Sequence, residues 1–177
     1  MIHFKSLAQK VGKWTILKLP QNESKKLPSR GQVMVNLKIQ GHTVVQVLEP
    51  DGRGGRWFKL PPDLLKNAKI TTGTIVSVSI ELTEKWQEPV KPQDFNQALK
   101  KASPFVQQLW QDITPMARWE WVRWINATTV PETRVRRIQV SISKMQSGKR
   151  RPCCFNLASC TDPNLSRGGK LIEPTVK

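Results

Sequence analysis

The hydrophobic residues of this chain change their spacing once, near residue 88 of 177. Before that point they recur at every second position, as Val33, Val35, Leu37 and Ile39 do, which is the spacing of one face of a β-strand. After it they recur every three or four residues, as on one face of a helix. The change predicts an α+β protein whose strands and helices are segregated along the chain.

The alternating part predicts about six strands with turn signals at short spacing. Gln40-Gly41 is expected to turn a hairpin, and Pro61-Pro62 to begin a short helix. This pattern favours an N-terminal β-barrel-like domain over residues 1–88. The expected strands lie in HFKSLAQ, GKWTILKLP, QVMVNLKIQG, HTVVQVLEP, WFKLP and TIVSVSIELT.

Pro89 and Pro92 mark a linker, beyond which the pattern becomes helical. Thr114 before Pro115 predicts a helix start, and Thr129 followed by Glu132 predicts a capping box for the next helix. We therefore expect a helical domain over residues 89–160. Residues 161–177, which are rich in Pro, Gly and Ser, are expected to form an irregular tail. The two predicted apolar stripes are Ala117, Trp121, Trp124 and Ile125, then Val135, Ile138, Ile142 and Met145.

The formal net charge is +16, and it is divided between both halves of the chain. Residues 1–90 carry 14 Lys and Arg against seven acids, and residues 91–177 carry 15 against six. Such a field attracts nucleic acid, anionic lipid or acidic protein without selecting among them. Because the sequence has neither an apolar run long enough for a membrane span nor a signal peptide, we expect a cytoplasmic protein.

Three motifs, RWEWVRWI, PETRVRRI and SGKRRPCCFN, resemble the YdeI/OmpD-associated, or bacteriocin-protection, family. The first half, with GKWTILKLP, RGQVMVNLKIQG and LPPDLLKNA, is similar to the small β-barrel domain of unknown function that often precedes it. The two resemblances cover residues 2–160. They imply no catalytic activity, and imply instead a non-enzymatic cytoplasmic protein that acts by binding in bacteriocin or stress tolerance.

A second likeness concerns LPPDLLKNAKITTGTIVSVSI, which resembles the helix–glycine–strand hinge of AbrB/MazE-type swapped-hairpin regulators. This resemblance implies a homodimer built through the barrel and a DNA- or RNA-binding function. The identity of the anionic partner stays open between nucleic acid and another acidic molecule.

Arginines dominate the motifs of the helical part and are the candidate anion-binding residues. The alternative is a solvated basic face in which they pair with acids such as Glu120 and Glu132. Trp121 and Trp124 are expected in the core, whereas Trp119 points elsewhere and could contact a ligand. The candidates are Arg118, Trp119, Arg123, Arg134, Arg136, Arg137, Arg150 and Arg151.

DGRGGRW has the glycines of a phosphate cradle without the Walker spacing, so a hairpin loop is expected, with Arg53 and Arg56 as anion candidates. Cys153, Cys154 and Cys160 lack zinc spacing, and we expect reduced thiols, no metal and no cofactor. With no Tyr, two His and scattered carboxylates, the sequence does not support an enzyme. A small-molecule or metal-dependent enzyme is the third class considered, because active sites assemble in space.

Overall fold

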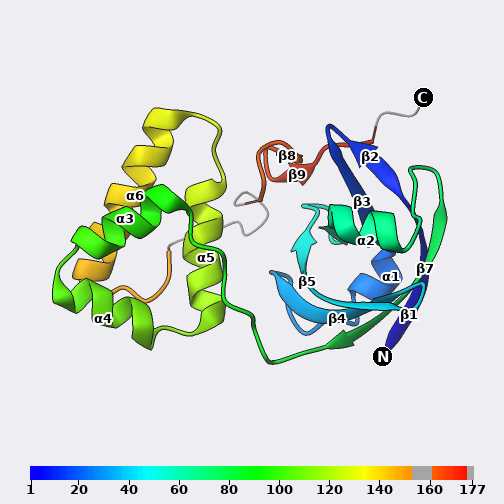
Figure 1. The fold of residues 1–177 in the computed structure, drawn as a ribbon, viewed down its shortest axis with the longest axis horizontal. Helices are drawn as coiled ribbons and strands as arrows, with labels where there is room; N and C mark the ends of the chain where they lie inside the picture. Colours follow the sequence, from blue (N-terminus) through cyan, green and yellow to red (C-terminus); the bar gives the residue numbers. More distant parts are fainter. Residues whose placement is uncertain (153–160, 175–177) are drawn as a thin grey trace. The chain divides into compact units, whose positions relative to one another are not determined.

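The computed structural model describes residues 1–152 and 161–174 as two compact units. The N-terminal unit contains residues 1–85 together with residues 164–174, and the helical unit contains residues 86–152 together with residues 161–163. Figure 1 shows strands in the first unit and helices α3 to α6 in the second. The predicted α+β class is confirmed.

The N-terminal unit is built on a curled sheet of seven antiparallel strands in the order β1-β7-β4-β5-β6-β3-β2. All the strands predicted from the alternation are present, and Gln40-Gly41 turns the β4–β5 hairpin with φ of 47° and 82°. Because β1 and β2 follow one another in the chain yet lie at opposite ends of the order, the sheet curls into a barrel-like form (Figure 1). The strands are β1 (Ile2–Leu7), β2 (Gln9–Val11), β3 (Trp14–Leu19), β4 (Val33–Ile39), β5 (His42–Pro50), β6 (Arg56–Lys59) and β7 (Ile75–Leu82).

Ser6 joins β1 to β3 where the curled sheet meets itself. Its Oγ donates to the carbonyl of Lys18 at 2.8 Å and accepts from the amide of Lys18 at 3.2 Å. A side chain thus takes the place of a backbone partner at this point of the sheet.

The main core of this unit lies inside the curl. Val33, Val35, Leu37 and Ile39, which were predicted to share one strand face, are all buried there. Two short helices, α1 (Gln21–Ser24) and α2 (Pro62–Asn67), complete the unit, and Leu64 of α2 packs into the core.

The segment expected to be an irregular tail contains a small hairpin, β8 (Ser166–Arg167) and β9 (Lys170–Leu171). Leu165 and Leu171 are fully buried in a second cluster of the N-terminal unit, against Ile16 and Trp57. The Pro, Gly and Ser content of this segment suggested an irregular tail. Gly168-Gly169 instead forms the turn of the hairpin, and the apolar residues on either side of it supply the packing.

The helical unit contains α3 (Gln93–Lys101), α4 (Pro104–Asp112), α5 (Pro115–Asn126) and α6 (Pro131–Gln146). Thr114 caps α5 as predicted, accepting from the amide of Ala117. The predicted capping box of α6 does not form, because the helix begins one residue later, with Val130 at the N-cap. No helix of the described residues is long and apolar enough to cross a membrane.

Trp121 is completely buried in the core of the helical unit, and Trp124 packs against its edge with ring centroids 6.3 Å apart. The predicted core role of both tryptophans is therefore confirmed. Val135, which the periodicity placed on the apolar stripe, is instead 55% exposed, since only part of the α6 stripe meets a neighbour.

Candidate anion-binding surface

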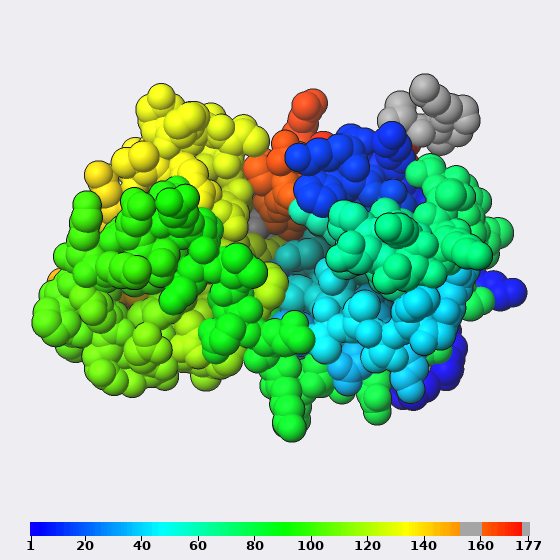
Figure 2. All heavy atoms as spheres, in the orientation of Figure 1, coloured from blue at the N-terminus to red at the C-terminus, as the bar shows by residue number. Residues whose placement is uncertain are grey.

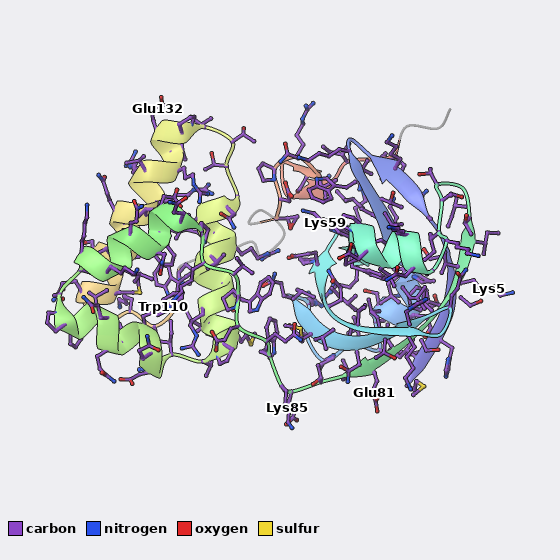
Figure 3. The ribbon with its side chains drawn as sticks, in the orientation of Figure 1. Lys5, Lys59, Glu81, Lys85, Trp110 and Glu132 are labelled. Carbon is purple, nitrogen blue, oxygen red and sulfur yellow. The ribbon has the colours of Figure 1, made fainter. Side chains whose placement is uncertain are left out.

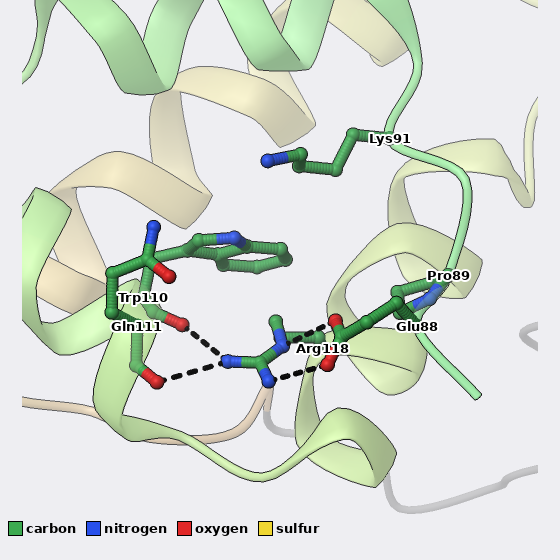
Figure 4. Close-up of a pocket in the computed structure, with 6 residues that line it drawn as sticks. All are labelled: Glu88, Pro89, Lys91, Trp110, Gln111 and Arg118. Carbon is green, nitrogen blue, oxygen red and sulfur yellow. Dashed lines mark hydrogen bonds and ion pairs between the residues drawn. The ribbon is translucent and has the colours of Figure 1, made fainter. Parts of the chain in front are cut away.

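Arg118 is held by groups of its own unit (Figure 4). Its Nε and Nη2 donate to the two carboxylate oxygens of Glu88 at 2.7 and 2.6 Å. Its Nη1 donates to carbonyls at the end of α4, those of Trp110 and Ile113 at 2.8 and 2.7 Å. The residue therefore ties the segment before α3 to the α4–α5 corner, and its charge is already matched.

The hollow beside Arg118 has a volume of about 380 Å³. Lys91 is its second cation; it is exposed and has no ion pair among the described residues. With Arg118 bonded to Glu88, only one ammonium remains to attract an anion into this hollow. Its lining residues are Glu88, Pro89, Lys91, Trp110, Gln111 and Arg118 (Figure 4).

Arg134 and Arg137 of α6 are also engaged inside the unit. Arg134 forms a two-point bond to Asp94 at 2.6 and 2.9 Å, and this hydrogen bonding lowers the pKa of the Asp94 carboxyl. Arg137 donates to the carbonyl of Trp124 at 2.7 Å and lies 5.5 Å from the centre of its ring. Both guanidiniums brace α6 against neighbouring segments.

Arg123 of α5, and Arg150 and Arg151 after α6, are also engaged within the helical unit. Arg123 is 8% exposed and donates to the hydroxyl of Thr161 at 3.1 Å, so the candidate predicted as a surface cation is buried. Arg150 donates to the carbonyl of Asp112 at 2.7 Å. Arg151 lies 3.4 Å from Glu120, whose pKa is nevertheless raised because burial outweighs the attraction of the arginines.

Arg136 and Trp119 are the last two candidates of the helical unit. Arg136 is exposed on α6, and its guanidinium forms no hydrogen bond or ion pair with another described residue. The Nε1 of Trp119 donates to the carbonyl of Gln87 at 2.7 Å, which fixes the ring to the segment before α3. Of the seven candidate arginines in this unit, Arg136 is the one left open to solvent and unbonded among the described residues.

The two loop candidates, Arg53 and Arg56, are likewise bonded within their own unit. Arg53 bonds to the carbonyl of Leu171 and pairs with Glu173, each at 3.0 Å. Arg56 is 4% exposed and donates to the carbonyls of Gly55 and Ser29, and burial lowers the pKa of its guanidinium. The DGRGG loop is therefore a packed turn, as the missing Walker spacing suggested.

The cations that remain open are mostly lysines of the N-terminal unit, which the sequence analysis did not single out. They are exposed, and their side chains have no hydrogen bond or ion pair with other described residues. Lys66 belongs to α2, which lies at the surface of this unit (Figure 2). Lys5 and Lys85 project from the same unit (Figure 3). The open cations of residues 1–85 are Lys5, Lys10, Lys25, Arg30, Lys38, Lys66, Lys69 and Lys85.

Lys5 and Lys38 share the outer face of β1, β7 and β4. Lys5 lies opposite Ser77, and Lys38 lies opposite Ser79 on the other side of β7. Two strand spacings across the sheet and an offset of two residues along it separate the lysines, about 12 Å between backbones. We call this surface, with Lys5, Lys38, Ser77 and Ser79, the outer lysine face. The Oγ of Ser79 is hydrogen-bonded to Nδ1 of His3 at 2.8 Å. Of these four residues, the two ammonium groups and the hydroxyl of Ser77 are therefore the donors that can bind phosphate or carboxylate oxygens.

No group of three or more His, Cys, Asp or Glu within residues 1–152 and 161–174 is arranged to hold a metal ion. Cys153, Cys154 and Cys160 lie outside the described residues.

Comparison with known families agrees with this two-part architecture. Residues 88–148 match the family described as bacteriocin-protection, YdeI or OmpD-associated. Residues 5–80 match a domain of unknown function, DUF1905. The chain thus joins a DUF1905 region to a following region that matches the YdeI/OmpD-associated family. The resemblance inferred from its motifs is thereby confirmed, and no curated protein matches the chain.

In the region that matches the YdeI/OmpD-associated family, two of the motifs contain arginines that bond within the helical unit. RWEWVRWI contributes Arg118 and Arg123, and PETRVRRI contributes Arg134 and Arg137. All four bond within the helical unit. These four motif arginines thus link segments of the helical unit to one another.

Proposed function

We propose that this protein acts by binding, without catalysis, in the cytoplasm, and contributes to bacteriocin or stress tolerance through an anionic partner. We further propose that the partner contacts the outer lysine face. The predicted division into a barrel domain over residues 1–88, a helical domain over 89–160 and a short C-terminal tail is part of the same proposal.

The charge of the N-terminal unit supports this proposal. Residues 1–85 and 164–177 carry 17 Lys and Arg against seven acids, an excess of +10. Residues 86–156 and 160–163 carry 12 against six, an excess of +6. The larger positive excess therefore belongs to the unit that carries Lys5 and Lys38, and such an electrostatic field raises the association rate with anionic molecules.

The proposal is tested by two charge-reversal variants with the same change in net charge. Lys5→Glu/Lys38→Glu reverses the outer lysine face, and Arg136→Glu/Lys149→Glu reverses exposed cations of the helical unit. Cells without the gene receive the wild type or one variant and are challenged with a bacteriocin. At equal protein levels, the first variant is expected to lose protection and the second to keep it. Equal survival with both variants, or survival unaffected by removal of the gene, would contradict the proposal.

A nucleic-acid-binding regulator is the second candidate, because phosphate is one of the anions that such lysines bind. It predicts that the affinity for a labelled DNA duplex or RNA strand falls steeply with salt, with a log–log slope of several units. A slope near zero, or no binding at low salt, would remove this candidate. The same two variants show which unit makes the phosphate contacts.

A further inference from the structure

We infer that the outer side of β2, β3 and β6 is a peptide-docking surface, and that residues 164–174 are its ligand, supplied by the chain itself. This surface is separate from the outer lysine face, and the inference goes beyond the proposed function. We call residues 164–174 the C-terminal strap.

The surface under the strap is apolar. Leu17 of β3 faces the main barrel core, whereas its neighbour Ile16 faces the other side of the sheet, and both are completely buried. Ile16 and Trp57 are covered there by Leu165 and Leu171 of the strap. Without the strap these residues would form an exposed apolar patch, and such a patch on a folded domain usually marks a binding site. Here the strap occupies it.

The strap is recognised through its backbone as well as its leucines. The amide of Leu171 donates to the carbonyl of Asp51 at 3.0 Å, and the carbonyl of Leu171 accepts from Arg53 at 3.0 Å. Gly168 and Gly169 have φ of 56° and 76°, as the tight turn between β8 and β9 requires. A Cβ on Gly52 would lie 2.0 Å from the carbonyl oxygen of Gly169, so a side chain at position 52 is incompatible with the docked strap.

An acidic group completes the recognition. Glu173 lies 3.0 Å from Lys18 and 3.0 Å from Arg53, both of which belong to the surface. The ligand is thus a peptide with two leucines six positions apart, a Gly-Gly turn between them and a carboxylate two residues after the second leucine.

The strap is a tethered ligand, because the chain itself connects it to the surface that it covers. It follows the whole helical unit in the sequence, and it lies beyond both family matches, which end at residues 80 and 148. Tethering raises the effective concentration of a ligand at its site without any need for high intrinsic affinity. A free peptide of the same sequence can therefore compete once the tether is cut.

The test uses the full chain with a protease site inserted between Pro163 and Asn164. After cleavage, the fragment 164–177 remains only if the surface holds it, which gel filtration with mass spectrometry measures. The fragment is then removed, and a labelled synthetic peptide of residues 164–177 reports binding to the vacated surface by fluorescence anisotropy. Gly52→Ala is the disrupting variant and Gly41→Ala its matched control, since φ is 74° and 82° at these positions but no atom lies within 4 Å of a Cβ at position 41.

The labelled peptide is expected to bind the cleaved wild type and the Gly41→Ala protein, and to bind Gly52→Ala at least about tenfold more weakly. A peptide carrying Leu171→Asp should bind the cleaved wild type more weakly by a similar factor, and this comparison holds even if Gly52→Ala fails to fold. No binding to the cleaved wild type, or equal affinity of the two peptides for it, would overturn the inference. Equal binding by folded Gly52→Ala and Gly41→Ala proteins would overturn it as well.

Discussion

Replacement of Ser6 by Ala should weaken the closure of the barrel. The substitution keeps the Cβ, so it removes the hydroxyl without opening a cavity of any size. Ser6 is 9% exposed, and its Oγ makes two bonds to one residue of β3, to the carbonyl and the amide of Lys18. The amide and carbonyl of a strand residue point to the same side, so both groups of Lys18 lose this partner together.

The expected loss follows from the two bonds. A hydrogen bond within a protein contributes about 0.5–1.5 kcal/mol to stability, so the pair contributes about 2 kcal/mol. With a denaturant slope of about 1–3 kcal/mol/M for urea, the midpoint of unfolding of the N-terminal unit should fall by about 1 M. The amide of Lys18 should also exchange its hydrogen faster than in the wild type, because it has lost its acceptor.

Ser77→Ala is the matched control, since Ser77 is an exposed strand serine whose hydroxyl has no bond to another described residue. Urea unfolding and hydrogen exchange of the two variants are compared with the wild type. If Ser6→Ala shifts the midpoint no further than Ser77→Ala, water replaces the hydroxyl and the closure does not depend on Ser6.

Three further predictions concern the helical unit. Trp121→Ala should lower its free energy of unfolding by about 3–5 kcal/mol in urea titrations, and Trp119→Ala, at a half-buried position, by less; equal losses would contradict the assigned core. Asp94 has a lowered pKa through its bond with Arg134, so it stabilises the fold above its ordinary pKa and loses this effect as the pH falls. Asp94→Asn should therefore have a lower Tm than the wild type at neutral pH, and this difference should disappear in acid. A difference in Tm that does not change with pH would refute this. Glu120 has a raised pKa through burial, so its charge opposes folding as the pH rises past the ordinary value of 4.5. Glu120→Gln should raise Tm at neutral pH but not at pH 4, and a lower Tm at neutral pH would show that attraction to the arginines dominates.

Most strands and helices could be predicted because they have a strong local signal, whereas β2, α1 and the β8–β9 hairpin were not predicted. The strands of the barrel alternate, α2 begins at a Pro pair, and Thr114 caps α5. The docking of residues 164–174 could not be predicted, because it depends on a contact between Gly52 and Gly169, more than 100 positions apart. The alternation of β3 also concealed that both of its faces are buried, since the strap covers one of them.

The positions of the candidate arginines were less predictable than the elements that carry them. Helical spacing gave Arg123 an exposed position, yet the neighbouring segment with Thr161 covers it. The spacing also could not show that Arg118 would reach Glu88, 30 residues earlier, or that Arg134 would reach Asp94. Pairing across elements is a tertiary property, which no periodicity in one helix encodes.

The chemistry of the two cations explains why arginines, more often than lysines, take the bonded positions in the helical unit. A guanidinium presents a planar set of donors, so it can bond to a carboxylate and to helix-end carbonyls at once, as Arg118 does. An ammonium is strongly hydrated and gains less from such fixed acceptors, and lysines therefore remain at the surface. In this protein the motif arginines hold the helical unit together, while Lys5 and Lys38 keep their charges in solvent. A search for the partner should accordingly begin with the lysines of the barrel, even though the arginines dominate the family motifs.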